Sequence, residues 1–155
     1  MGFAVLLVVI AGLAGQGGQG GQAGQSASPP ANPFAGVRSL ACTFPVYARA
    51  DLTATPPQPV SRQQEFTFTL DSFDFKKSRA RLVGSGGAAV PVSLLTSQVG
   101  ITVIEQTLIG NVNMTTVFAA GSHDDTRLAV HSRHFGDPTE LPSVSQAYGT
   151  CVVQK

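Results

Sequence analysis

The chain has 155 residues, a formal net charge of +1 at pH 7 and only 12% charged residues. This length allows one domain, and its surface must be largely uncharged, because charged residues normally make up about a quarter of a soluble protein. The longest basic run is the pair Lys76 and Lys77. The chain therefore lacks the basic patch that nucleic acid or an anionic membrane surface would require, and we expect neither as a partner.

The N-terminus carries an apolar run at residues 2–15. This run is shorter than the roughly 20 residues that a membrane-spanning helix needs, and it has the length of a signal-peptide core. We predict a signal peptide at residues 1–15, cleaved after Ala14 or near Gly21 and Ala23. The mature protein would then be periplasmic or secreted and would have no membrane span. No basic residue precedes the run, which leaves an uncleaved membrane anchor as the alternative.

The segment that follows, residues 16–36, opens with QGGQGGQAGQSASPPANP and consists mainly of Gly, Gln, Ala, Ser and Pro. Such a composition cannot bury enough apolar surface to offset the chain entropy lost on folding. We therefore predict a disordered tether at residues 16–36, followed by one β domain at residues 37–155.

Short runs rich in Val, Ile, Thr and Phe recur from residue 37 onward, between turn-forming Gly, Pro, Asn and Asp. No segment has the apolar period of a long amphipathic helix. In residues 65–70, Phe and Leu alternate with Thr, as in a strand with one buried face. These patterns predict an all-β domain of about eight antiparallel strands, at residues 39–48, 65–73, 80–83, 89–94, 101–109, 113–119, 127–134 and 146–153.

The connections between these strands have recognisable turn chemistry. Gly110 and Asn111 are typical of a tight hairpin, and residues 84–87 and 121–125 are typical of looser turns. Residues 53–59 contain three prolines. Because proline cannot donate a hydrogen bond to a strand ladder, we predict a loop there.

Two cysteines lie in the first and last predicted strands, at Cys42 and Cys151. In an exported protein such a pair usually forms a disulfide. The bond would make the terminal strands neighbours, as in a closed antiparallel barrel with meander topology; a sandwich with paired terminal strands is the alternative. On the chain-entropy model the bond would add roughly 4 to 5 kcal/mol of stability. Lipid attachment at Cys42 is a second interpretation, although this cysteine lies far beyond the apolar run.

All three histidines lie in residues 122–134. On a strand, His131 and His134 point to opposite faces, so they cannot chelate one metal ion together. We interpret His123 as a solvated turn residue, His131 as a surface cross-strand partner and His134 as a strand-end residue. The sequence therefore predicts neither a metal site nor a cofactor.

Catalytic motifs are not evident in the sequence. It has no Gly-x-Ser-x-Gly elbow, no His-Glu-x-x-His and no Cys-x-x-Cys. Glu105 shares a strand face with apolar residues, where burial would raise its pKa and suit it to acid or base catalysis. An enzymatic alternative would gather Glu105, His131, Asp124 and Asp125 in space. We otherwise expect no catalytic residue.

Two classes of function follow from these features. The first is an exported, non-catalytic β domain that binds a small apolar ligand, a glycan or an envelope protein through its loops or the mouth of its barrel. The alternative is a hydrolase or metal-dependent enzyme built around His131 and Glu105. Convergence of at least three of the polar candidates in one pocket would favour the enzyme, whereas their dispersal would favour binding or a structural role.

Overall fold

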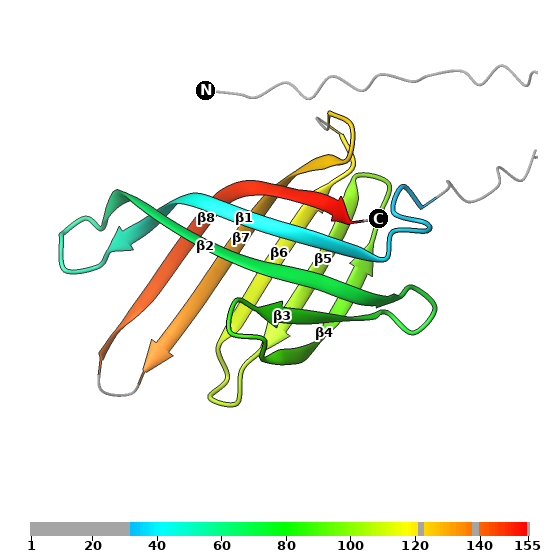
Figure 1. Cartoon of the computed structure of the whole chain (residues 1–155). Coiled ribbons are helices and arrows are strands. Elements are labelled where there is room, and N and C mark those ends of the chain that lie inside the picture. The colour runs from blue at the N-terminus through cyan, green and yellow to red at the C-terminus, as the bar shows by residue number, and fades with distance from the viewer. Residues whose placement is uncertain (1–31, 121–122, 138–139, 155) are drawn as a thin grey trace, which may run out of the picture.

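A computed structural model describes residues 32–120, 123–137 and 140–154 of the chain. These residues form eight antiparallel strands that close into one barrel in sequence order (Figure 1). The strands are β1 (Ser39–Asp51), β2 (Gln58–Asp74), β3 (Arg79–Gly84), β4 (Ala89–Thr96), β5 (Gly100–Gln106), β6 (Val112–Phe118), β7 (Thr126–Asp137) and β8 (Glu140–Gln154). The prediction of an all-β fold with eight strands is confirmed. The strands close into a barrel and do not form the alternative sandwich.

The barrel closes where β1 pairs with β8. Cys42 lies directly opposite Cys151 in this pairing, and the two residues form the predicted disulfide, which spans 109 positions of the chain. Such a bond indicates an oxidising compartment. The described ranges contain no helix long and apolar enough to cross a membrane.

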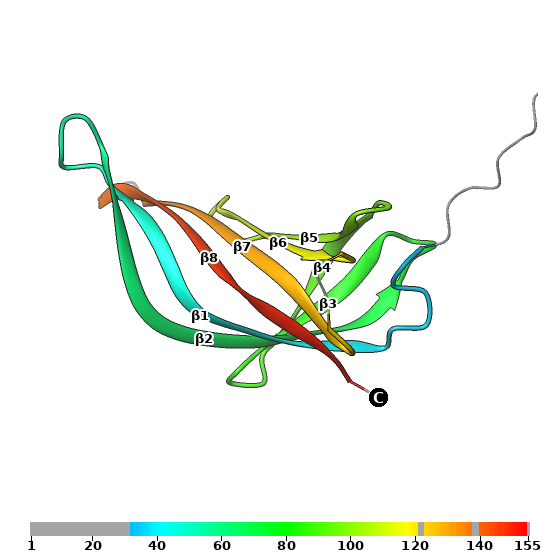
Figure 2. The ribbon, with the colours of Figure 1, turned by 90° about the horizontal axis from the view of Figure 1, so that it is seen from above.

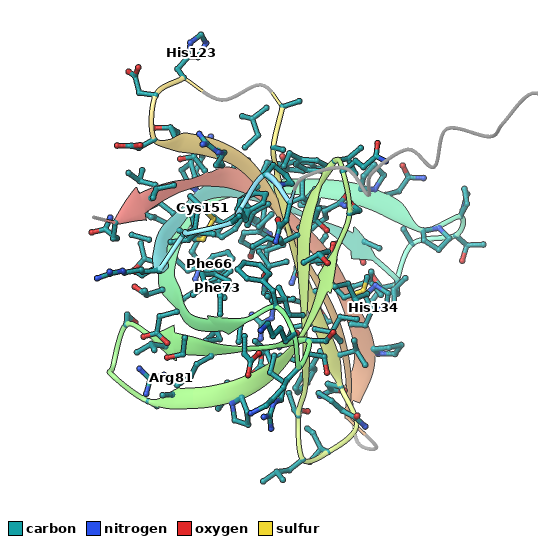
Figure 3. All side chains as sticks on the ribbon, turned by 90° about the vertical axis from the view of Figure 1, so that its right-hand side faces the viewer. Phe66, Phe73, Arg81, His123, His134 and Cys151 are labelled. Atoms are coloured by element: carbon teal, nitrogen blue, oxygen red, sulfur yellow. A yellow bond between two sulfur atoms is a disulfide. The ribbon has the colours of Figure 1, made fainter. Side chains whose placement is uncertain are left out.

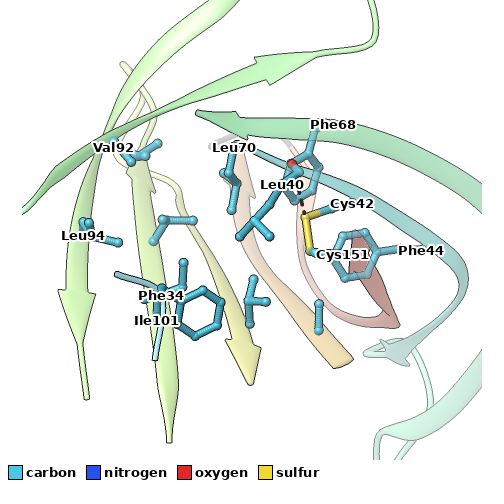
Figure 4. Close-up of a cluster of buried hydrophobic side chains, with 14 of the residues drawn as sticks. Phe34, Leu40, Cys42, Phe44, Phe68, Leu70, Val92, Leu94, Ile101 and Cys151 are labelled. Atoms are coloured by element: carbon cyan, nitrogen blue, oxygen red, sulfur yellow. Dashed lines mark hydrogen bonds between the residues drawn. A yellow bond between two sulfur atoms is a disulfide. The ribbon is translucent and has the colours of Figure 1, made fainter. Parts of the chain in front are cut away.

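One end of the barrel is filled by apolar side chains (Figure 4). Leu40, Leu70 and Ile101 point inward from three strands and are almost completely buried. Phe34, which precedes β1, joins this cluster with only 1% of its surface exposed. The predicted tether therefore extends too far, because residue 34 belongs to the core. The predicted signal peptide and the rest of the tether up to residue 31 lie outside the described residues.

The other end of the barrel is uneven, because its strands differ in length. Residues 58–63 of β2 pair only with β1, since β3 joins β2 at Phe68. β2 therefore has a free edge here, while β1 stays paired with β8 as far as Arg49, and the tip of the β1–β2 hairpin extends beyond the neighbouring strands (Figure 2). This pairing corrects the loop predicted at residues 53–59, because β2 starts at Gln58. Pro59 is tolerated there because β2 has an unpaired edge at this point.

The β5–β6 connection also differs from its prediction. β5 ends at Gln106 and not at residue 109, so Leu108 and Ile109 lie exposed in the turn. Gly110 adopts a positive φ of 86°, while the side chain of Asn111 accepts a hydrogen bond of 2.8 Å from the backbone of Gly136 on β7. The apolar run in the sequence is therefore longer than the strand. Its last two residues, Leu108 and Ile109, lie in the turn and face solvent and not the core.

The seam of the barrel, where β1 pairs with β8, is closely packed at Gly149. The register of β1 shifts between Thr43 and Val46, which brings β1 backbone against β8. A Cβ atom added at Gly149 would lie 2.0 Å from the carbonyl oxygen of Thr43 and 2.9 Å from the Cα of Phe44. Only glycine fits this position without movement of the backbone.

Candidate ligand-binding site

The strand registers arrange the inward-facing side chains of β5 to β8 in three levels. From the filled end to the open end, these levels are Ile101, Val117 and Ala129; then Val103, Thr115, His131 and Ala147; then Glu105, Asn113, Arg133 and Ser145. The side chains thus change from apolar to polar along the barrel axis. This gradient gives the two ends of the barrel different chemistry.

A cavity of about 220 Å³ occupies the polar end. The residues that line it include Tyr47, Arg49, Phe66, His131, Arg133 and Ser145. They come from β1, β2, β7 and β8, which are the strands on either side of the closing seam. The cavity therefore combines aromatic surface, two cations and hydrogen-bonding groups within one concave site.

His131 lies at the inner end of this cavity and is only 6% exposed. Its Nδ1 shares a hydrogen bond of 2.8 Å with the hydroxyl of Thr115. Its ring packs against Phe44, Phe66 and Phe68, with centroid distances of 5.3 to 5.7 Å. The interpretation of His131 as a surface residue is therefore wrong.

The error concerns which face of β7 points inward. Strand alternation puts Ala129, His131 and Arg133 on one face of β7. That face lines the interior, whereas Leu128 on the opposite face remains 49% exposed. Because the barrel holds a polar cavity at this end, the more apolar face of the strand is not the inner one.

The burial of His131 determines its charge. Burial, assisted by the positive charge of Arg133, lowers the pKa of this imidazole from 6.5 to about 4. The ring is therefore neutral at pH 7, with one nitrogen able to donate a hydrogen bond and the other able to accept one. Nδ1 is occupied by Thr115, and Nε2 makes no hydrogen bond to a described residue. Nε2 is thus the nitrogen that a bound molecule can use.

Glu105 belongs to the interior face but has a different partner. The side-chain amide of Asn113 donates a hydrogen bond of 2.7 Å to its Oε2. Glu105 on β5 and His131 on β7 do not lie on adjacent strands, because β6 lies between them. Glu105 instead lines a second, more open hollow of about 620 Å³, which it shares with Val90, Leu108 and Ile109.

The remaining candidates for an enzyme site lie elsewhere. Asp124 and Asp125 precede β7, whose first residue pairs with Val152 near the end of β8. This position is at the filled end of the barrel, opposite the cavity. The four candidates Glu105, His131, Asp124 and Asp125 therefore do not converge, and no group of three potential metal ligands occurs among the described residues.

The two other histidines lie outside the cavity. His123 lies exposed at the tip of the turn before β7, away from Phe66 in the barrel (Figure 3). His134 is exposed on the outer face of β7, opposite Val112 and Val144 in the neighbouring strands. Neither can contribute to the same site as His131.

Four lining residues were not predicted from the sequence as site residues, namely Arg49, Arg133, Tyr47 and Phe66. Arg133 could have been predicted as a neighbour of His131, since strand alternation puts both side chains on the same face of β7. Arg49 and Tyr47 lie on β1, and only the closure of the barrel brings them beside β8. We found no protein family model, curated protein or solved structure that matches the chain.

Proposed function

We propose that this protein binds a small molecule in the cavity at the open end of its barrel and performs no covalent chemistry on it. The observation that carries this proposal is the difference between the two ends of the interior. One end is filled by Phe34 and the apolar cluster, whereas the other is hollow and lined by converging polar and aromatic groups. A concave site with a few oriented polar groups is the usual form of a binding site.

Binding is favoured over catalysis by the composition of the cavity. No carboxylate is among its described lining residues, and His131 is bonded to Thr115 and not to a nucleophile oriented toward the cavity. Glu105, the other candidate acid or base, accepts a hydrogen bond from Asn113 and lines the second hollow and not this cavity. These positions do not provide the pair of groups that acid–base or nucleophilic catalysis requires.

We further propose that the protein works in the periplasm or outside the cell. The disulfide between Cys42 and Cys151 supports an oxidising environment. The apolar run at residues 2–15 supports export. In such a compartment a barrel with an open mouth would capture a diffusing ligand.

The test is native mass spectrometry of protein purified from its own host, together with two matched variants. Ala147→Phe would fill the cavity from its inner wall, where Ala147 is 3% exposed. Gln146→Phe adds the same ring one residue earlier, on the outer face. We expect a bound species on the wild-type protein and on Gln146→Phe, and its loss from Ala147→Phe.

Two results would contradict the proposal. One is a bound species that Ala147→Phe retains in full, since that species would occupy another place. The other is the absence of any bound species, combined with unchanged NMR signals of His131 and Ala147 when aromatic fragments are added. Circular dichroism of Ala147→Phe would show whether the variant keeps its β structure.

A further inference from the structure

We propose that the cavity selects a small organic anion, whose carboxylate or equivalent acid group lies between Arg49 and Arg133 and whose apolar part contacts Phe66. This inference rests on the proposed binding function and adds the chemical class of the ligand. Three observations support it: the positions of the two arginines, the lack of a carboxylate partner for either arginine among the described side chains, and the aromatic surface beneath them.

The two arginines flank one residue of β8. Arg49 on β1 pairs in register with Ser145, and Arg133 on β7 pairs with the same Ser145 from the other side. Neighbouring strands lie about 4.8 Å apart, so the Cα atoms of the two arginines are about 10 Å apart across Ser145. Both side chains line the cavity. Two guanidinium groups therefore extend toward the same opening with a hydroxyl between them.

Neither arginine forms an ion pair with any carboxylate side chain that the structure describes. Arg81 on the barrel exterior provides a contrast, because it forms two hydrogen bonds of 2.8 Å to Asp71. The charge of Arg49 does reach Asp51, but that carboxylate is bonded to the hydroxyl and backbone of Thr53. Among the side chains that the structure describes, these two cations thus have no carboxylate partner, and guanidinium groups match the geometry of carboxylates closely.

The surface beneath the arginines suits the rest of such a ligand. Phe66 and Tyr47 contribute aromatic surface, and the imidazole of His131 forms the inner end. Because burial keeps the pKa of His131 at about 4, this ring offers a hydrogen bond near pH 7 without a third positive charge. The volume of about 220 Å³ is below the roughly 300 to 1,000 Å³ of sites for drug-sized molecules. A single-ring or short-chain acid therefore fits the site best.

Three probes of nearly equal shape separate charge from size, namely benzoate, benzamide and benzamidinium. Each would be titrated into the mature protein near pH 7 and followed by calorimetry and by the NMR signals of His131. We expect benzoate to bind about tenfold more tightly than neutral benzamide, because charge-assisted hydrogen bonds are the stronger kind. Benzamidinium should bind more weakly than either.

Variants of the arginines assign the site. Arg133→Gln and Arg49→Gln should each weaken benzoate binding by about tenfold and leave benzamide binding unchanged. Arg133→Lys keeps the charge without the planar fork and should give an intermediate loss. Arg81→Gln, on the exterior, should change nothing and controls for total charge. Circular dichroism of each variant verifies the fold.

The outcomes distinguish this inference from the proposed function. Equal binding of benzoate and benzamide, abolished for both by Ala147→Phe, would leave a binding cavity but overturn its selectivity for anions. Preference for benzamidinium would overturn the selectivity as well. If none of the probes binds at millimolar concentration to correctly folded protein, the anion inference is wrong, and the proposed function then depends on the ligand retained from the host.

Discussion

Thr115 on β6 and His131 on β7 face each other directly across the sheet inside the barrel, and their side chains share a hydrogen bond of 2.8 Å. The hydroxyl fixes the orientation of the imidazole, and burial keeps the ring neutral, with a pKa lowered to about 4. A buried neutral histidine links the stability of the fold to pH, because unfolding allows the ring to take up a proton.

We predict that stability is lost in weak acid. The pKa of His131 is about 4 in the folded protein and 6.5 in its ordinary state, so between these values the unfolded chain binds more protons. This contribution to the free energy of unfolding should be complete above pH 6.5 and should fall by about 3 kcal/mol as the pH drops to 4. Urea denaturation at a series of pH values measures it.

Two variants identify the source of that loss. His131→Gln can still hydrogen-bond to Thr115 but does not titrate, and its stability should change much less over this range. His134→Gln on the outer face should behave like the wild type. The hydrogen bond with Arg81 lowers the pKa of Asp71. The contribution of Asp71 to stability is therefore lost at lower pH than the contribution of His131. An unchanged pH dependence in His131→Gln would contradict the assignment.

The disulfide should contribute a large share of the stability. Replacing Cys42 and Cys151 together by Ala releases a closed loop that spans 109 positions, and the chain-entropy model puts the loss at about 4 to 5 kcal/mol. Urea denaturation of the double variant measures the loss. Wild-type protein with its disulfide reduced should show a similar loss. Equal stability of the oxidised protein and the double variant would refute this prediction.

Gly149→Ala should destabilise the barrel by about 1 to 3 kcal/mol, which is the usual cost of overpacking. The added methyl group would collide with the backbone at Thr43 and Phe44, and backbone cannot move aside as a flexible side chain can. Gly86→Ala is the control, because nothing lies within 4 Å of its added Cβ. Thermal denaturation of both variants compares them, and equal melting temperatures would show that the seam is looser than described.

Substitutions of two leucines should differ greatly in cost. Leu94 is 1% exposed in the core, so Leu94→Ala should cost about 2 to 5 kcal/mol. Leu108 is fully exposed in the β5–β6 turn, and Leu108→Ala should change stability by less than about 0.5 kcal/mol. A large cost at Leu108, measured by urea denaturation, would restore the longer strand that the sequence pattern suggested.

The strands could be predicted because their signals are local. In residues 65–70 the alternation of apolar residues with Thr identifies a strand without knowledge of its neighbours, and the two cysteines suggested which strands meet. Strand ends were less predictable. Leu108 and Ile109 continue an apolar pattern into solvent, while residues 58–63 lack an apolar pattern but pair with β1.

The site was harder to predict because it depends on contacts between distant segments. Alternation placed His131 and Arg133 on one face of β7, but Leu128 and Val130 made the other face the more apolar one. Only the closed barrel shows that His131 faces inward and that Arg49 on β1 lies across β8 from Arg133. The position of a cavity cannot be inferred from one strand.

The order of the strands also governs how the chain must fold. Every strand pairing except that of β1 with β8 joins consecutive strands, and such hairpins form quickly because their ends are close in the chain. The β1–β8 pairing brings together residues as distant as Ser39 and Gln154, so the entropy of closing this long loop should limit the rate of folding. An unfolded chain that retains its disulfide has already closed the loop. Its refolding, followed by stopped-flow fluorescence of tyrosine, should therefore be faster than that of the reduced chain.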